Sequence, residues 1–318
     1  MAGAEKVAII GSGLIGRAWA ISFARGGRSV ALYDADQTAV AEALRTVGAL
    51  VAALAARGML RDQDPPSVLE RVRGSATLEA ALEDAHHVQE CVPEDVALKR
   101  ETFARLDEAA DADAVLASSS SAILPSRFTE GLAGRHRSLV VHPINPPYLV
   151  PAVEIVPAPW TDPAVVERTA SLMRAIGQVP IIMRRELDGF IMNRLQGALL
   201  QEAFRLVAGG YATTEDVDAG ICQGIGLRWA FMGPFETIDL NAPGGVRDYI
   251  ARYEGLYTLL AKSQAEPAAW SGELADRVEA ERSRQVPRER LAERQQWRDR
   301  RLMALLADLA RAEQEIGK

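Results

Sequence analysis

The chain has 318 residues, of which 48% are hydrophobic and 25% are charged. This is the composition of an ordinary globular protein, and the length suggests about two domains, each able to bury a core. The formal net charge of −7 disfavours nucleic acid or an anionic membrane as the main partner.

Few residues are available for a disulfide framework or a metal site. The two cysteines, Cys91 and Cys222, form no C-x-x-C motif, and the four histidines form no H-E-x-x-H motif, so no metal is predicted. By inspection, no apolar run reaches the length of a membrane span. The N-terminus shows no basic leader before the apolar run at Val7. These features predict a cytoplasmic protein with no membrane partner.

Apolar runs of strand length recur through the first part of the chain. They are residues 7–10, 30–33, 88–92, 115–117, 139–141, 153–156 and 179–183. Stretches of helix length lie between most of them, namely residues 14–25, 38–56, 97–110 and 163–176. This alternation predicts an α/β domain whose mostly parallel sheet is covered on both faces.

After about Arg185 the pattern becomes helical. Expected helices cover residues 188–207, 215–223, 234–240, 246–262, 273–284 and 287–315. We therefore predict an α/β domain over residues 1–187 and an all-helical domain over residues 188–318. The stretch 281–301 holds eight arginines and four acids. We interpret it as a solvated amphipathic helix, the alternative being an anion-binding arm.

A glycine-rich turn, G-S-G-L-I-G, follows the first predicted strand and opens a helix. Gly11 permits a tight turn, Gly13 lets the backbone approach a pyrophosphate, and Gly16 lets the helix pack closely on the strand. With Leu14 and Ile15 between them, these glycines predict a dinucleotide-binding turn at a helix N-terminus.

The second predicted strand ends in Asp34, 23 residues after Gly11. A carboxylate at this place accepts hydrogen bonds from the ribose hydroxyls of NAD and repels the 2′-phosphate of NADP, so NAD is predicted. The alternative is that the glycine turn is purely structural and that Asp34 caps a loop.

Polar side chains follow the later strands. A run of four serines ending at Ser121 follows residues 115–117, His142 and Asn145 follow residues 139–141, and Glu154 lies in residues 153–156. The carboxyl ends of parallel strands face the ligand crevice. There a histidine can take a hydroxyl proton, and Glu154 can bond its other ring nitrogen. Taken alone, His142 is equally compatible with a hydrogen-bonded core histidine.

Several of these segments together resemble a known family. They are the glycine turn, the serine run, H-P-I-N-P from His142, Glu154 nine residues after Asn145, and G-F-I-M-N-R from Gly189. Over essentially its whole length the chain resembles the 3-hydroxyacyl-CoA dehydrogenase superfamily. This resemblance implies a Rossmann-type NAD-binding domain followed by a helical domain, and an NAD-dependent dehydrogenase that is a homodimer.

The resemblance also implies roles for single residues. His142 is the catalytic base and Glu154 orients it, while Ser121 and Asn193 bond the reacting hydroxyl or the carbonyl that forms.

Three further residues are implied to lie on the cofactor side, namely Glu94, Lys99 and Asn145; Asn145 also matches a substrate-side position. The alternative for Lys99 is a solvated helix residue. His86 and His87 precede a predicted strand and are expected in a surface loop.

The substrate is predicted from the scarcity of lysine. Only four occur, at positions 6, 99, 262 and 318, whereas the resemblance implies that CoA-ester enzymes use a lysine-rich stretch. Segments 11–19, 89–95, 142–148, 228–231 and 296–299 resemble the lambda-crystallin branch. That resemblance implies a small L-gulonate-like hydroxy acid, with Arg228 as candidate partner of its carboxylate. The alternative for Arg228 is a salt bridge at a domain interface.

The predicted reaction is NAD-dependent oxidation of a 3-hydroxyl to a keto group. Two alternatives remain open. The substrate is a 3-hydroxyacyl-CoA or another β-hydroxy acid such as carnitine, or the chain is a non-catalytic NAD-binding protein with a structural role.

Overall fold

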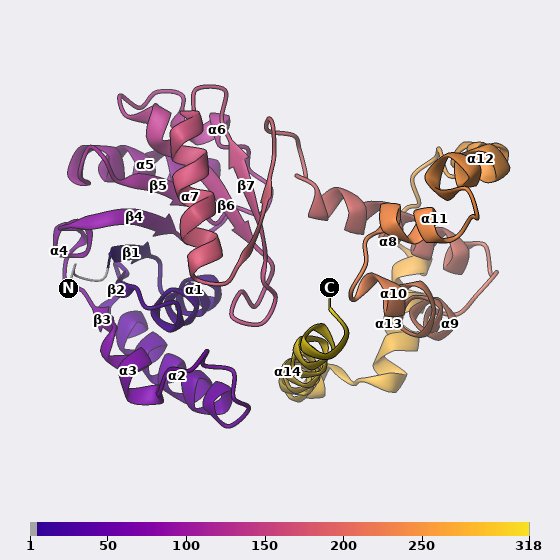
Figure 1. Cartoon of the computed structure of the whole chain (residues 1–318), viewed down its shortest axis with the longest axis horizontal. Helices are drawn as coiled ribbons and strands as arrows, with labels where there is room; N and C mark the ends of the chain where they lie inside the picture. The colour runs from indigo at the N-terminus through magenta and orange to yellow at the C-terminus, as the bar shows by residue number, and fades with distance from the viewer. Residues whose placement is uncertain (1–4, 318) are drawn as a thin grey trace. The chain divides into compact units, whose positions relative to one another are not determined.

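The computed structural model describes residues 5–317 and divides the chain into two compact units. The first unit ends at Met192 and the second begins at Asn193. The sequence predicts the boundary after residue 187, a few residues earlier. The first unit combines strands and helices, and the second has helices only over its described residues (Figure 1).

A single sheet organises the first unit. Over the described residues it has eight strands in the order β3-β2-β1-β4-β5-β6-β7-β8 (Figure 1). The strands are β1 Lys6–Ile10, β2 Ser29–Tyr33, β3 Val72–Gly74, β4 Ala85–Glu90, β5 Val115–Ser118, β6 Ser138–Pro143, β7 Ala152–Pro157 and β8 Val179–Ile182. Neighbouring strands are parallel, except that β6 and β7 are antiparallel. The sheet order reverses around β1 and β4, where a Rossmann-type fold forms its ligand crevice.

Helices connect these strands. They are α1 Leu14–Arg25, α2 Gln37–Ala55, α3 Pro65–Glu70, α4 Leu78–Leu82, α5 Val96–Ala109, α6 Ser126–Thr129 and α7 Pro163–Ala175, with a 3₁₀ turn at Arg135–Arg137. Most of them begin at a side chain that accepts a backbone N–H bond, including Asp36 for α2, Asp95 for α5 and Asp162 for α7. Such caps fix where each helix begins, each contributing about 1 kcal/mol.

The two faces of the sheet bury different helices. Ala8 and Ile10 of β1 belong to a core cluster with residues of α4, α5 and α6, in which Phe103 and Phe128 pack with ring centroids 4.7 Å apart. On the opposite face, Phe23 of α1 packs against His87 of β4. Side chains alternate between the faces of a strand, so one strand serves both cores.

The position of His87 differs from the prediction that His86 and His87 lie in a surface loop. The strand β4 begins at Ala85, earlier than predicted, and includes His86 and His87. His87 is 2% exposed, whereas its neighbour His86 faces solvent. The pair therefore lies in a strand and not in a surface loop.

The helix α2 corrects a second expectation. It is long and apolar enough to cross a membrane by length and composition, although the sequence was interpreted as containing no such run. Its apolar character comes from many alanines and from a core face that includes Val40, Val47 and Val51. In the structure α2 packs against α1, α3 and the strands β2 and β3. It therefore serves as a covering helix of the α/β unit.

The second unit consists of helices over its described residues. They are α8 Met192–Ala208, which begins at the last residue of the first unit, α9 Thr214–Ala219, α10 Gly226–Trp229, α11 Pro234–Leu240, α12 Gly245–Ser263, α13 Glu273–Gln285 and α14 Leu291–Ile316. A π-helical turn, Gly220–Ile225, separates α9 from α10, and a 3₁₀ turn, Arg288–Arg290, precedes α14. Along α14, Arg298 pairs with Asp299 and Arg311 with Asp308, while the Arg294 guanidinium lies 3.4 Å from the centroid of the Trp297 ring.

Candidate active site

The glycine turn between β1 and α1 has the geometry that each glycine was predicted to allow. Gly11 has φ +106°, and a Cβ there would lie 2.7 Å from the Cys91 carbonyl oxygen. A Cβ on Gly16 would lie 1.8 Å from the Gly11 carbonyl oxygen. Gly13 instead has no heavy atom within 4 Å of a Cβ placed there. The turn is therefore closed at its two ends and open at Gly13, where a phosphate must approach.

Asp34 stands beside this turn, at the end of β2. One carboxylate oxygen, Oδ2, accepts bonds from the Ser12 backbone N–H and the Ser12 hydroxyl, at 2.8 and 2.9 Å. The other, Oδ1, accepts the Asp36 backbone N–H at 3.1 Å. Ser12 thus holds the carboxylate next to the turn, a contact that the motif spacing did not reveal.

A cavity of about 550 Å³ lies at the same place. Its walls include Gly11, Gly13, Leu14, Ile15, Tyr33, Asp34, Leu78, Cys91, Val92, Leu98, Thr102 and Arg105. Gly13 is the N-cap of α1 and no side chain caps it, so the positive end of this helix faces the turn. These residues fit NAD, because the turn can bind the pyrophosphate and Asp34 the ribose hydroxyls. Leu98, Thr102 and Arg105 of α5 were not predicted, because only the fold brings α5 to this cavity.

His142 and Glu154 face each other across the antiparallel strands β6 and β7, where they are direct register partners. His142 Nδ1 lies 2.7 Å from Glu154 Oε2, and both residues are buried. Glu154 thereby fixes the orientation of the imidazole, and Nε2 is the ring nitrogen that remains for exchanging a proton with a substrate.

The segment that follows β8 completes this pair. Gly189 and Phe190 both have positive φ, +77° and +49°, so the chain turns sharply there. The backbone N–H groups of Ile191 and Met192 then donate to Glu154 Oε1, at 2.7 and 2.9 Å. The fully buried Phe190 ring packs 5.6 Å from the His142 ring, centroid to centroid. The G-F-x-x-N-R segment was predicted from resemblance, but these contacts were not.

Glu154 keeps its charge despite burial. Burial raises the pKa of its carboxyl, but the bonds from His142 and from the two backbone N–H groups lower the pKa more. The net result is a pKa below the ordinary glutamate value. The carboxylate beside Nδ1 can therefore stabilise the imidazolium that forms when His142 accepts a proton.

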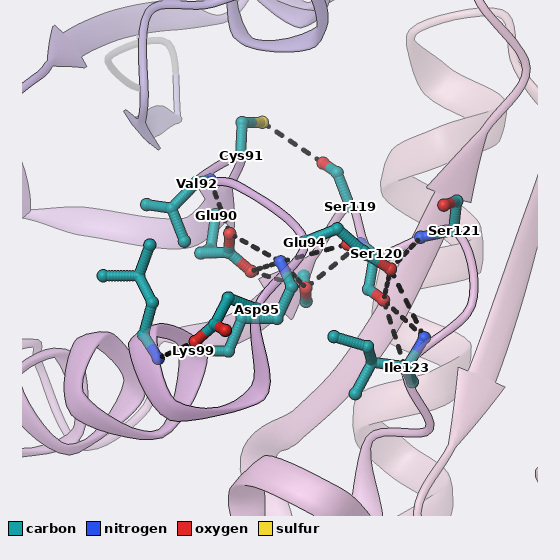
Figure 2. A network of polar contacts seen from close by, with 12 residues as sticks. Glu90, Cys91, Val92, Glu94, Asp95, Lys99, Ser119, Ser120, Ser121 and Ile123 are labelled. Atoms are coloured by element: carbon teal, nitrogen blue, oxygen red, sulfur yellow. Dashed lines mark hydrogen bonds and ion pairs between the residues drawn. The ribbon is translucent and has the colours of Figure 1, made fainter.

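The serine run follows β5, and Figure 2 shows what holds it. Glu94 Oε1 accepts the Ser120 hydroxyl at 2.6 Å and the backbone N–H groups of Ser121 and Ala122, both at 3.0 Å. Lys99 is 1% exposed, and its ammonium lies 3.0 Å from the carboxylate of Glu90. In this structure Glu94 and Lys99 therefore bind protein groups, and their predicted cofactor contacts stay predictions.

Three further predicted residues lie at exposed positions or in the second unit. Asn145 is exposed in the loop between β6 and β7, three residues after His142. Asn193 is the second residue of α8 and Arg228 is an exposed residue of α10, both in the second unit. Among residues 5–317 no group of three His, Cys, Asp or Glu side chains is placed to hold a metal ion.

The fold and the glycine-turn cavity define an NAD-dependent dehydrogenase of the Rossmann type. Two family models identify which kind of dehydrogenase it is. The model of the 3-hydroxyacyl-CoA dehydrogenase NAD binding domain matches residues 6–187, and the model of the 3-hydroxyacyl-CoA dehydrogenase C-terminal domain matches residues 189–286. The chain belongs to the 3-hydroxyacyl-CoA dehydrogenase family. This confirms the predicted fold class, the predicted enzymatic class and NAD as the cofactor.

Similar proteins place the chain more finely within this family. A lambda-crystallin homolog of Mus musculus is 45% identical over 95% of both chains. An L-carnitine dehydrogenase of Streptomyces griseus is 41% identical over 76% of this chain and 71% of its own length. Among solved structures, a diketoreductase has a TM-score of 0.67 and 30% identity, over 80% of this chain and 93% of its own. The predicted resemblance to the lambda-crystallin branch is thereby confirmed.

Proposed function

We propose that the chain oxidises the 3-hydroxyl of a small free hydroxy acid, L-gulonate or a close relative, with His142 as general base. The observation that carries this proposal is the 2.7 Å contact between His142 Nδ1 and Glu154 Oε2. It is a buried, oriented imidazole at the carboxyl-terminal end of a sheet strand, the arrangement that proton transfer needs.

The chain's own groups divide the work as follows. Glu154 accepts a hydrogen bond from Nδ1–H, so the neutral imidazole presents its Nε2 lone pair to the substrate hydroxyl. As Nε2 takes the hydroxyl proton, the imidazolium is stabilised by the adjacent carboxylate. The glycine turn and Asp34 would hold NAD, which would supply the acceptor for the hydride from C3. Ser121 and Asn193 are proposed to bond the oxygen at C3 as it becomes a carbonyl.

The placement of the lysines supports a small substrate. Lys6 Nζ donates to the backbone carbonyls of Ala80 and Glu83, and Lys99 Nζ is buried against Glu90. Two of the four lysines are therefore engaged within the first unit and are poor partners for the phosphates of CoA. A free hydroxy acid needs one cation for its carboxylate, and we propose Arg228 for that role.

A carnitine-like substrate is the second candidate, because the similar proteins include L-carnitine dehydrogenases of Streptomyces griseus and Pseudomonas putida, the latter 35% identical. L-gulonate, L-carnitine, 3-hydroxybutyrate and 3-hydroxybutyryl-CoA offered side by side, with NADH formation followed by absorbance, separate the candidates. We expect the highest kcat/KM with L-gulonate. Preference for the CoA ester refutes a free-acid substrate, and no turnover of any substrate despite tight NADH binding supports a structural role.

We further propose that the chain is a homodimer that associates through its helical unit. Large apolar side chains of this unit are more than 60% exposed, including Leu227, Phe231, Phe235, Leu240 and Leu259. Exposed apolar surface of this extent is typical of an association site. Sedimentation equilibrium should give twice the chain mass, and Phe235→Ser together with Leu259→Ser should shift it toward the monomer. A monomeric mass for the unmodified protein contradicts this proposal.

A further inference from the structure

A buried ion pair joins the end of β4 to α5. Glu90 is the last residue of β4 and Lys99 lies on α5, with exposed fractions of 0% and 1%. The Lys99 ammonium lies 3.0 Å from each carboxylate oxygen of Glu90 (Figure 2). Removing two charges from water costs about as much as their attraction returns, so such a pair is a weak source of stability. The position of the Glu90–Lys99 pair, between β4 and α5, indicates a role besides stability.

Glu90 also binds the two segments on either side of it. Its Oε1 accepts the Val92 backbone N–H at 2.6 Å, and its Oε2 accepts the Ser118 hydroxyl at 2.5 Å. Its backbone carbonyl accepts the Ser119 N–H at 2.8 Å. One side chain thus ties the loop after β4, the helix α5 and the end of β5 together, with every carboxylate oxygen occupied.

The second contact of Lys99 leads to the serine run. Its ammonium lies 3.6 Å from Glu94 Oε2, while Glu94 Oε1 accepts the N–H groups of Ser121 and Ala122. Burial opposes the charge on Glu94, but the Ser120 hydroxyl, the Lys99 charge and the N–H groups lower the pKa of this carboxyl overall. Lys99 therefore stands between two carboxylates, of which one is fixed in the core and the other holds the turn after β5.

This turn follows the strand that pairs with the strand of the proposed base. Ser118, the last residue of β5, pairs with Val140 of β6, and His142 lies two residues further along β6. A displacement of the turn would therefore move Ser121 relative to the imidazole.

We propose that Glu90 and Lys99 are positioning residues, whose buried pair holds Glu94 and, through it, the turn that presents Ser121 beside His142. The proposal rests on the function proposed above. Lys99 then acts through Glu94.

The test replaces both charges at once, since a single replacement would leave an unpaired charge in the core. In Glu90→Gln/Lys99→Met the volumes are nearly kept. We expect the amides of residues 121–123 to exchange hydrogen at least about tenfold faster. We also expect kcat to fall about tenfold or more, as misplaced reacting groups predict.

A matched control removes another nearly buried pair of the same unit, Arg137 with Asp107. Asp107→Asn/Arg137→Met should lower the melting temperature without affecting exchange at residues 121–123. If the first double variant does not fold, Glu94→Ala removes the acceptor of the turn while leaving the buried pair in place, and the same faster exchange is expected.

Unchanged exchange at residues 121–123 overturns the proposal in either variant. Hydrogen exchange needs no substrate. It therefore decides the positioning role even if the unmodified protein turns over none of the four hydroxy acids.

Discussion

His142 is oriented by one neighbour, Glu154. Glu154 has two oxygens with different partners, His142 on one side and the N–H groups of Ile191 and Met192 on the other. Backbone N–H groups can only donate hydrogen bonds. Any atom that replaces Glu154 Oε1 must therefore be a hydrogen-bond acceptor. The chemical identity of the Glu154 side chain therefore sets which imidazole nitrogen carries the proton.

Glu154→Gln should reveal this dependence. The backbone N–H groups would hold the amide oxygen, so the amide NH₂ would donate to Nδ1 and force the proton onto Nε2. Nε2 could then no longer accept the substrate proton, and kcat should fall by about 10³- to 10⁴-fold, as in other triads with the wrong tautomer. His142→Gln should fall by about 10²- to 10⁴-fold.

Both variants should bind NADH normally, which fluorescence titration measures, because neither residue lines the glycine-turn cavity. Full activity of Glu154→Gln at neutral pH would exclude the proposed arrangement of the proton.

Arg228 is tested at the same scale. If its guanidinium pairs with the carboxylate of a free hydroxy acid, Arg228→Met should raise KM for L-gulonate by about tenfold or more, the usual worth of a charged hydrogen bond. The affinity for NADH should not change, and Arg228→Lys should recover part of the loss. Steady-state kinetics with KM unchanged would favour the alternative of a structural salt bridge.

At the scale of elements, the contact between β1 and α1 is set by glycines with opposite surroundings. A methyl group on Gly16 would overlap the Gly11 carbonyl, whereas one on Gly13 would meet no protein atom within 4 Å. Gly16 is therefore required by packing. Gly13 is required only if a ligand occupies the space beside it.

Two alanine variants separate these requirements. Gly16→Ala should destabilise the first unit by about 1–3 kcal/mol, because the helix must shift to relieve the overlap. Gly13→Ala should melt like the unmodified protein but bind NADH at least about tenfold more weakly. Gly48→Ala, inside α2 and also without close neighbours, should be neutral or stabilising by up to about 1 kcal/mol. Normal NADH affinity of Gly13→Ala would argue against a pyrophosphate at this turn.

Helices and strands with a clear pattern of apolar residues were predictable from the sequence. Elements whose existence or ends depend on contacts with other segments were not. The seven predicted strands all occur, but β3 was missed because Val72–Gly74 is short, and its pairing with β2 identifies it as a strand. The helix after β8 was predicted to begin at residue 188. It begins at Met192 because Gly189 and Phe190 adopt positive φ. The helix predicted over residues 215–223 is α-helical only to Ala219 and continues as the π turn Gly220–Ile225, in which Gly224 departs from helical angles.

The candidate site divides in the same way. His142 and Glu154 were predictable, because a motif places both on strands. The contacts of Glu154 with Ile191 and Met192, and the burial of Lys99, depend on segments far apart in sequence that only the fold brings together.

At the scale of the molecule, one buried histidine links stability to pH. Burial lowers the pKa of His87 to about 4, with the charge of Arg168 acting in the same direction and the Gln89 hydrogen bond opposing it. In the unfolded chain the pKa is about 6.5. Between these values the unfolded state binds one more proton, so stability rises with pH. The contribution of His87 is complete above about pH 6.5 and is lost as the pH falls toward 4.

His87→Gln should remove this dependence. From pH 7.5 to pH 5.0 the unmodified protein should lose about 2 kcal/mol of unfolding free energy through His87, and the variant should lose that much less. Urea unfolding at the two pH values measures the difference. The matched control is His86→Gln, the exposed neighbour on the same strand, which should keep the full dependence. Equal slopes for the two variants would show that His87 is protonated in the folded state.

The pairing of β6 with β7 also limits which sequence changes this enzyme can tolerate. His142 and Glu154 are opposite each other in an antiparallel ladder, so their spacing is set by strand register and not by the length of the loop 144–151. Residues can be inserted into or deleted from that loop while the pair survives. A single insertion within either strand would turn one of the two side chains to the other face of the sheet. Loop diversification for new substrates should therefore begin at residues 144–151, with both strands left intact.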